Sequence, residues 1–395
     1  MIAKYRSLLV VPGFTRVLGT ALLGRLPQGM SSLAVLLLVR GATHSYSAAG
    51  VAVGAYAFAG AALAPVQGRL VDRHGRARVL ASCALAQAAA LVALVLSARA
   101  GAAAALLVAL AALSGGLIPA IAPSVRALLR ELLSDPEVRE TAYALESVVQ
   151  ELIWITGPLL VALAIALVSP SGALLLSAAI GIAGTLLFIS SPLARGAGRR
   201  GERHRRPAVL AVPELRRLLP AMALMGASLG AIEVGLPSLA LYAGSRPSSG
   251  LLLALWSVGS LAGGLWYGSR SWRVPLHRRY RGLMASAVVA TAPLIAARTI
   301  PEAALAGLLA GVTIAPAFSC AYALLGRAVT PGIETEAFTW ATAALIVGVA
   351  AGSALAGASI DAAGVSGPFV LACGASALAA AMAMRGAGQR RPQAA

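Results

Sequence analysis

The sequence is a succession of apolar segments, each about twenty residues long and separated by short polar loops. A helix needs roughly 20 residues to cross the ~30 Å hydrocarbon core of a bilayer, where every backbone group must be bonded internally. Twelve such helices need about 240 residues, and the chain has 395. Because 59% of the residues are hydrophobic and only 12% are charged, most soluble and disordered classes are excluded. We therefore predict an all-α membrane protein with twelve transmembrane helices.

The apolar runs are about twice as long as a strand of a membrane barrel needs, which favours helices over strands. Arg16 and Arg25 interrupt the first run, so an uncleaved first helix is expected rather than a signal peptide. The twelve predicted helices lie over residues 17–39, 48–70, 78–98, 102–129, 142–168, 172–190, 216–242, 248–269, 282–298, 303–327, 335–360 and 365–385.

The basic residues are distributed unevenly between the two ends of these helices. With the N-terminus inside, 27 Arg and Lys residues fall on the inner side and four on the outer side. Positive residues concentrate on the cytoplasmic side, so both termini are expected in the cytoplasm. The formal charge of +18 lies in short runs between apolar segments, which argues against a nucleic-acid partner. The abundance of Arg, Ala and Gly indicates a bacterial source, and hence the bacterial cytoplasmic membrane.

Residues 191–213 form the longest polar segment and are rich in Arg, Gly and Pro. They divide the chain into an N-terminal six-helix bundle (1–190), a cytoplasmic Arg-rich linker (191–213) and a C-terminal six-helix bundle (214–395). We therefore expect two domains that each contain six of the predicted helices.

The two halves resemble one another at an offset of about 195 residues. Ala142-Tyr143 corresponds to Ala337-Phe338, and the segment at 67–79 has a faint counterpart at 263–274. Parallel six-helix repeats are typical of transporters whose halves rock around a central site.

Residues 68–78 read GRLVDRHGRAR and lie between the second and third predicted helices. This run resembles the loop motif Gly-x-Leu-x-Asp-Arg-x-Gly-Arg-x-Arg of the major facilitator superfamily. Gly68 permits a close helix contact and Gly75 a tight turn. The resemblance implies a transporter of two pseudo-symmetric six-helix bundles, in which Asp72 bonds across the cytoplasmic closure between the halves. The candidate gate residues are Gly68, Asp72, Arg73, Gly75, Arg76 and Arg126.

The partner of Asp72 is expected to be either Arg126 or the start of the eleventh helix, because a helix N-terminus attracts an anion. That helix opens with Glu334 and Glu336, whose charges would repel Asp72, so an ion pair with Arg126 is favoured. For the individual Arg residues of the loop, the alternative is that they only determine topology and face anionic lipid.

Ionisable side chains inside membrane helices cost at least ~2.5–3.5 kcal/mol on insertion scales and therefore mark functional candidates. Glu233 is the first candidate for proton coupling, because no Arg or Lys shares its helix. Arg25 can hold either an acidic partner or an anionic group of a substrate. The candidates for the central cavity and for proton coupling are Arg25, Gln28, Gln150, Glu151, Trp154 and Glu233.

In the fifth predicted helix, Glu146, Gln150 and Trp154 share one face at i, i+4 and i+8. Glu151 lies about 100° from Gln150 around the helix, so this carboxyl is expected to contact a neighbouring helix. Two states of Glu151 remain open: a protonated carboxyl, or an ion pair with Arg25.

Gly157-Pro158 in the same helix resembles the Gly-Pro element of the family's antiporter signature, although the further glycines of that signature are absent. The pair predicts a helix kink and slightly favours export over uptake.

No metal or cofactor is expected. The three cysteines lie inside apolar stretches, where free Cys is usually a small buried hydrophobe, and the four histidines lie in or near loops. Lys4 is the only lysine, so no Walker-type phosphate loop exists, and neither an ATP-driven pump nor an enzyme is indicated.

These observations predict a secondary transporter that exports a small amphipathic molecule by alternating access, driven by inward proton movement. Its expected partners are the small-molecule substrate, protons and membrane lipid, and the family resemblance implies a monomer. Two alternatives remain: a proton-linked uptake permease for an organic anion bound by Arg25, and a non-transporting membrane sensor or scaffold.

Overall fold

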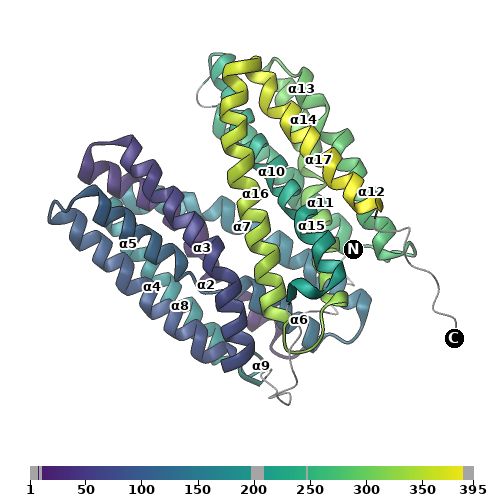
Figure 1. Cartoon of the computed structure of the whole chain (residues 1–395), viewed down its shortest axis with the longest axis horizontal. Coiled ribbons are helices and arrows are strands. Elements are labelled where there is room, and N and C mark those ends of the chain that lie inside the picture. The colour runs from purple at the N-terminus through teal and green to yellow at the C-terminus, as the bar shows by residue number, and fades with distance from the viewer. Residues whose placement is uncertain (1–7, 9–10, 197–208, 246–247, 386–395) are drawn as a thin grey trace.

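A computed structural model of the chain describes residues 8, 11–196, 209–245 and 248–385, and every regular element in these ranges is a helix (Figure 1). The helices of the first half are α2 (Phe14–Thr43), α3 (Tyr46–His74), α4 (Arg76–Arg99), α5 (Ala104–Gly116), α6 (Ile121–Leu132), α7 (Pro136–Leu167) and α8 (Pro170–Ser190). Those of the second half are α10 (Pro213–Tyr242), α11 (Ser248–Gly268), α12 (Leu276–Thr291), α13 (Pro293–Ala296), α14 (Ile300–Gly311), α15 (Ile314–Ala328), α16 (Glu334–Ala363) and α17 (Gly367–Arg385).

Short elements lie between these helices. A 3-10 turn, η2 (Gly364–Ser366), joins α16 to α17. The ends of the predicted linker 191–213 carry α9 (Pro192–Gly196) and the 3-10 turn η1 (Val209–Ala211). Its centre, residues 197–208, lies outside the described residues.

Eleven helical segments in the described ranges are long and apolar enough to cross a membrane. The predicted ninth span, 282–298, is instead divided into α12 and α13, and α12 begins at Leu276. Pro293 follows the break, where its ring and missing N–H prevent the helix from continuing. The earlier start brings Arg278, Arg279 and Arg281 into α12, which makes this segment more polar than the sequence analysis expected.

The fourth span of each half is broken at equivalent places, whereas the sequence analysis predicted continuous helices. α5 ends at Gly116 and α6 begins at Ile121, with Pro119 in the gap. In the second half, α14 ends at Gly311 and α15 begins at Ile314. Pro316 in the first turn of α15 cannot donate a backbone hydrogen bond to the preceding turn, which favours the break.

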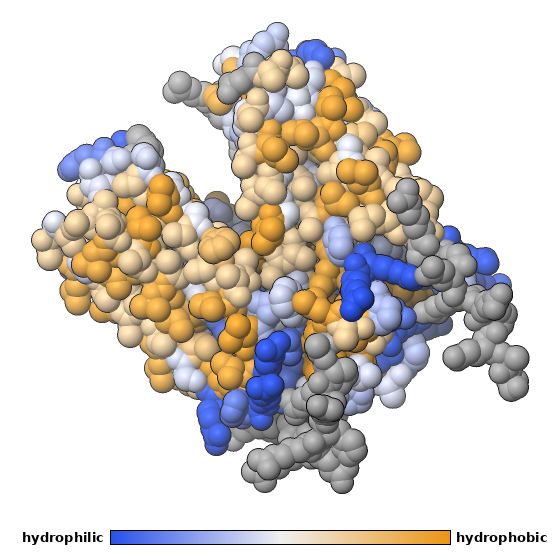
Figure 2. Space-filling view, in the orientation of Figure 1, coloured by the Kyte–Doolittle hydropathy of each residue, from blue (hydrophilic) through white to orange (hydrophobic). Residues whose placement is uncertain are grey.

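The two halves meet at one end of the molecule and separate at the other (Figure 1). The buried apolar side chains of the described residues show the same asymmetry. One cluster contains residues of both halves, such as Tyr143 and Phe338, whose ring centroids lie 6.1 Å apart. The other two clusters are each confined to one half. Figure 2 shows the surface hollowed between the halves at the end away from α6. We call the joined end the closed end and the hollow the central opening.

On the face shown in Figure 2, the outer surface of both halves is largely apolar. Phe58, Leu167 and Val289 are each more than 70% exposed, which is typical of a surface covered by lipid chains rather than water. Inside each half, glycines let the helix backbones approach closely. An added Cβ at Gly115 of α5 would overlap the Tyr56 backbone of α3, and one at Gly348 of α16 would overlap Ala223 of α10. Small residues of this kind drive helix packing in membranes.

Candidate functional site

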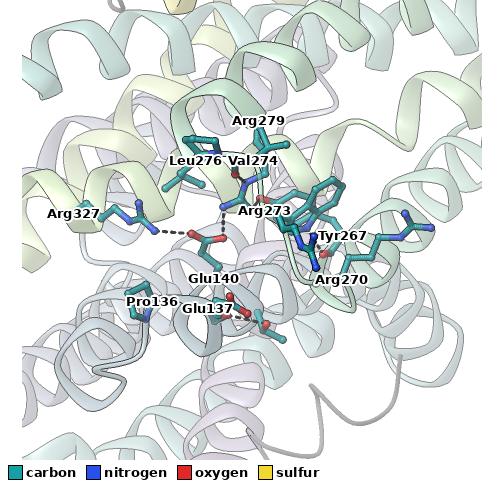
Figure 3. A pocket seen from close by; sticks show the side chains of 14 residues that line it. Pro136, Glu137, Glu140, Tyr267, Arg270, Arg273, Val274, Leu276, Arg279 and Arg327 are labelled. Atoms are coloured by element: carbon teal, nitrogen blue, oxygen red, sulfur yellow. Dashed lines mark hydrogen bonds and ion pairs between the residues drawn. The ribbon is translucent and has the colours of Figure 1, made fainter. Parts of the chain in front are cut away.

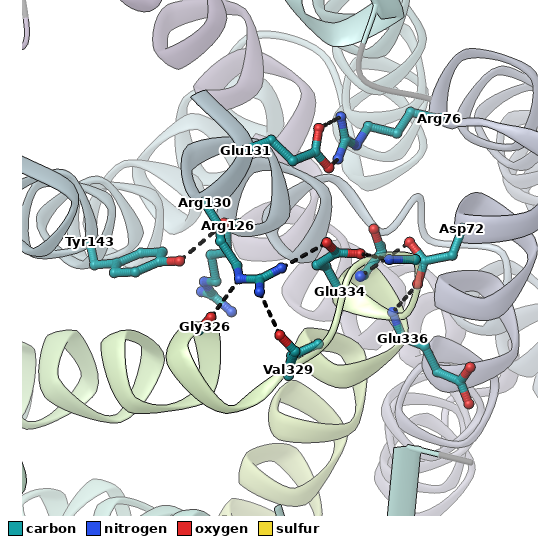
Figure 4. Close-up of polar contacts among 12 residues, drawn as sticks. Asp72, Arg76, Arg126, Arg130, Glu131, Tyr143, Gly326, Val329, Glu334 and Glu336 are labelled. Carbon is teal, nitrogen blue, oxygen red and sulfur yellow. Dashed lines mark hydrogen bonds and ion pairs between the residues drawn. The ribbon is translucent and has the colours of Figure 1, made fainter. Parts of the chain in front are cut away.

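Asp72 lies at the closed end and connects the two halves. Its carboxylate accepts the backbone N–H groups of Thr335 (3.2 Å) and Glu336 (2.9 Å) in the first turn of α16 (Figure 4). The first N–H groups of a helix have no partner within the helix and carry its positive partial charge. α16 has Ile333 as its N-cap, which provides no side-chain cap, so Asp72 supplies the cap from the other half.

The expected ion pair between Asp72 and Arg126 is therefore wrong. The Arg126 guanidinium instead donates to both oxygens of Glu146, at 2.9 and 3.1 Å. The sequence analysis disfavoured the N-terminus of α16 as the partner of Asp72 because Glu334 and Glu336 would repel it. In the structure, both of these carboxylates are paired with Arg residues of the first half. Arg130 donates to Glu334 (2.7 Å) and Arg69 to Glu336 (2.7 Å). These pairs offset the repulsion that the sequence analysis anticipated.

The other residues of the loop motif have different roles in the structure. An added Cβ at Gly68 would meet Thr339 and the Glu336 backbone of α16, so this glycine allows the contact between the halves. Gly75 has φ = 89°, a conformation that side chains rarely adopt. Arg76 is buried and pairs with Glu131 inside the first half, whereas Arg73 is exposed.

A second set of charged contacts joins the halves around Glu140 near the start of α7. Arg279 of α12 donates to one oxygen of Glu140 (2.7 Å) and Arg327 of α15 to the other (2.8 Å). None of these three residues was among the sequence candidates. The repeat could have indicated them, since the first turns of α7 and α16 occupy corresponding positions in the two halves.

A buried ionic network lies between the closed end and the central opening. Glu146 is fully buried and contacts Arg25 of α2 at 3.0 Å in addition to Arg126 of α6. The Arg25 side chain also donates to the amide oxygen of Gln150, and its Nε has no hydrogen-bond partner among the described residues. Arg126 stacks over the Tyr322 ring of the second half, 3.8 Å from the centroid. Two buried cations therefore share one carboxylate.

Arg25 thus has an acidic partner, and that partner is Glu146 rather than Glu151. Glu151 accepts a hydrogen bond from the Ser260 hydroxyl of α11 at 2.9 Å, which places it against a helix of the other half. The Glu233 side chain of α10 is accessible to solvent but crowded by protein atoms that desolvate its carboxyl, and its charge lies close enough to Glu151 to interact with it. The structure therefore brings together two candidate carboxyls, one from each half.

Trp154 and Gln28 lie near this network. Trp154 is 54% exposed and lies roughly 40° around α7 from Gln150, which bonds Arg25. The exposed Leu159 lies roughly 180° from Gln150, on the face that lipid would cover. We infer that Trp154 faces the central opening. Gln28 is half-buried, about one turn from Arg25 along α2.

Gly157 and Pro158 lie within the continuous helix α7, where the sequence analysis predicted a kink. Gly157 is buried, and an added Cβ would overlap the backbone of Gly29 in α2. The absence of a side chain at Gly157 therefore allows two helices of the first half to pack with their backbones in contact.

We expect Gly157→Val to destabilise the protein by about 1–3 kcal/mol or more, the usual cost of overpacking, because α2 and α7 would have to separate. The matched control is Gly54→Val in α3, where an added Cβ meets nothing within 4 Å. Thermal unfolding of the purified protein in detergent measures both changes. Equal melting temperatures for the two variants would contradict the packing role of Gly157.

Comparisons with known proteins are consistent with this architecture. The family model described as Major Facilitator Superfamily matches residues 17–306. A search of curated proteins gave no match. The structure resembles that of the human organic anion transporter MFSD10 (TETRAN), with a TM-score of 0.73, 19% identity, and coverage of 93% of this chain and 99% of that chain.

Two further solved structures are similar. A bacterial homologue of the iron transporter ferroportin, in an outward-facing state, has a TM-score of 0.76 and 16% identity, covering 94% of this chain and 98% of that chain. FucP, a fucose:proton symporter of E. coli solved in the outward conformation, has a TM-score of 0.71 and 14% identity, covering 95% of this chain and 98% of that chain. At these identities the similarity shows the fold, and the substrates differ among the three.

Proposed function

The chain belongs to the major facilitator superfamily and is a membrane transporter, and we propose that it exports a small amphipathic molecule in exchange for protons by alternating access. In this proposal residues 1–190 and 214–395 are the two moving domains and 191–213 is their linker. The transporter acts as a monomer with lipid around its apolar surface.

The closed end is proposed to be cytoplasmic. The basic residues of the loops gather there, including Arg73, Arg78, Arg273 and Arg278, all of which are exposed. Positive residues favour the cytoplasmic side, so both termini lie in the cytoplasm and the central opening faces outward. The amino-acid usage supports a bacterial cytoplasmic membrane as the location.

The observation that carries proton coupling is the placement of Glu151 and Glu233. They lie on opposite halves, their charges interact, and neither forms an ion pair with an Arg among the described residues. Carboxyls within membrane helices typically mark proton relays in transporters. We propose Glu233 as the first proton site, with Glu151 responding to its charge.

Export of an amphipathic compound is supported by the apolar residues that flank Glu151 and Glu233 in the sequence and by the exposed side chain of Trp154. Binding pockets for small molecules are typically apolar with a few placed polar groups. The Gly157-Pro158 pair resembles part of an antiporter signature, which favours exchange over symport.

The test is proton flux in everted membrane vesicles that contain the protein, challenged with a panel of drugs and metabolites. We expect compounds that are transported to release protons from wild-type vesicles, and Glu233→Gln to abolish this release, because an amide cannot carry the proton. Glu214→Gln, an exposed change in the first turn of the same helix, should retain it. Release that persists in Glu233→Gln would move the coupling role to Glu151.

A second candidate is uptake of an organic anion, favoured by the excess positive charge of the buried network. In the described part of the chain, Glu146 is the one acidic partner of both Arg25 and Arg126, and the buried Nε of Arg25 has no hydrogen-bond partner. A substrate carboxylate would balance this charge. Accumulation of a labelled anion in intact cells, with no proton release in everted vesicles, would favour this function over export.

A further inference from the structure

The two halves use equivalent glycines to make equivalent contacts. Gly68 of α3 packs against Thr339 of α16 in the second half. Gly264 of α11, which corresponds to Gly68 in the repeat, packs against Val148 and, at 4.0 Å, Ala144 of α7 in the first half, and also against Ala315 of its own half. Ala144 in turn corresponds to Thr339 at the offset of about 195 residues. The closed end therefore contains two related contacts between the halves.

These two contacts differ at the position four residues after each glycine. Four residues after Gly68 is Asp72, which bonds the first turn of α16. Four residues after Gly264 is Gly268, which has no side chain to reach α7. At this place the structure has a cavity of about 230 Å³, lined by Gly268 and Tyr267 together with Glu137, Glu140 and Thr141 of α7 (Figure 3). The second contact thus has a cavity beside Gly268, at the position that the Asp72 side chain occupies in the first contact.

The cavity has an excess of positive charge. Four arginines line it, Arg270, Arg273, Arg279 and Arg327, against two acids, Glu137 and Glu140. Figure 3 shows Glu140 held between Arg279 and Arg327. The start of α7 is capped by its own Asp135, whose side chain accepts the Glu137 N–H, so the attraction for an anion comes from the arginines rather than from the helix N-terminus.

We propose that this cavity binds a phosphate group, which adds a negative charge from outside the chain beside Gly268, the counterpart of Asp72 in the repeat. Arg guanidinium groups bind phosphate oxygens through charged, often bidentate hydrogen bonds. The walls come from α7 in the first half and from α11, α12 and α15 in the second. This consequence rests on the proposed alternating access: a bound phosphate holds the closed end together and thereby favours the outward-open state.

The surroundings favour the headgroup of an anionic lipid as the source of the phosphate. Trp272 stacks on Tyr267 with ring centroids 5.1 Å apart, and Trp266, 40% exposed, packs against Trp272 at 5.5 Å. Trp and Tyr gather at the level of lipid headgroups, and basic residues at the cytoplasmic surface attract anionic lipid. Inorganic phosphate is the other source of the same chemistry.

The test measures binding by thermal stabilisation of the purified full-length protein in detergent. The probes are a short-chain phosphatidylglycerol, inorganic phosphate and, for comparison, a short-chain phosphatidylcholine. The variants are Gly268→Asp, which places a carboxylate beside the cavity as Asp72 does, and Arg273→Gln, which removes one lining cation. Arg278→Gln, an exposed residue of α12 outside the cavity lining, is the matched control.

We expect saturable stabilisation of the wild type and of Arg278→Gln, and an affinity about tenfold weaker in Gly268→Asp and Arg273→Gln, as loss of one charged contact predicts. A response to phosphatidylglycerol alone identifies the lipid, and a response to inorganic phosphate identifies the free ion. No saturable stabilisation, or equal responses of all variants, overturns the proposal. If Gly268→Asp does not fold, the comparison of the affinities of Arg273→Gln and Arg278→Gln tests the proposal. This binding measurement requires no transport, so its failure is distinct from failure of proton exchange.

Discussion

Glu146→Gln is expected to destabilise the protein by about 3–5 kcal/mol, the usual effect of removing one partner from a buried ion pair. Glu146 is 0% exposed and its carboxylate contacts both Arg25 and Arg126, which are themselves 1% and 3% exposed. An amide in its place would leave two neighbouring buried cations without a counter-charge. Thermal unfolding in detergent measures the loss, and transport is expected to disappear with it.

A double variant separates the charge effect from a general loss of packing. Removing one cation as well, in Glu146→Gln/Arg25→Gln, leaves Arg126 as the single buried charge of the network, so part of the stability should return. Glu214→Gln, at an exposed site, should change stability by no more than about 1 kcal/mol, the upper range for an exposed acid near a helix N-terminus. A melting temperature of Glu146→Gln equal to that of the wild type would contradict the proposed network.

Asp72→Asn is expected to shift the protein away from the state described here, toward one in which the closed end opens. The carboxylate accepts two backbone N–H groups of α16, and the neutral amide has one accepting oxygen. Losing a charged hydrogen bond costs about 1.5–3 kcal/mol, which corresponds to a roughly ten- to hundredfold change in the equilibrium. Transport should slow because the cycle needs this end to close.

Spin labels on the exposed residues Ser134 and Ser271, in loops of opposite halves at the closed end, measure this shift as a distance distribution. The three native cysteines are first replaced. Asp72→Asn should increase the population at longer distances, whereas Arg73→Gln, an exposed neighbour of Asp72 at the end of α3, should leave it unchanged. Identical distributions for wild type and Asp72→Asn would show that the Asp72 contact does not hold the closed end.

Asp72 shows how far the sequence analysis reached. The loop motif identified it as a residue of the contact between the halves, and its partner was reduced to two options. The wrong option was favoured because Glu334 and Glu336 were considered without their own partners. Arg130 and Arg69, which pair with them, lie about 200 and 270 residues away in sequence, and helical spacing says nothing about contacts over that separation.

The buried network shows the same limit. Arg25 was expected to point inward because of its cost in lipid, and Glu146 was known only as a member of the Gln150 face of its helix. Only the packing of α2 on α7, through Gly29 and Gly157, brings Arg25 to Glu146 rather than to Glu151. Glu140 and its two Arg partners were not recognised, because each is an ordinary loop-end charge until the halves are brought together.

The sequence by itself determined the all-helical membrane architecture, the two related halves and the family. These features depend on local sequence. Apolar runs of bilayer length must form helices to satisfy their backbone hydrogen bonds, and a repeat or a motif can be read directly from the order of the residues. The tertiary structure decided which charges pair, which helix face points to the opening, and where the arginine-lined cavity lies. Those depend on helix rotation and on neighbours remote in sequence, which are set by side-chain packing in three dimensions.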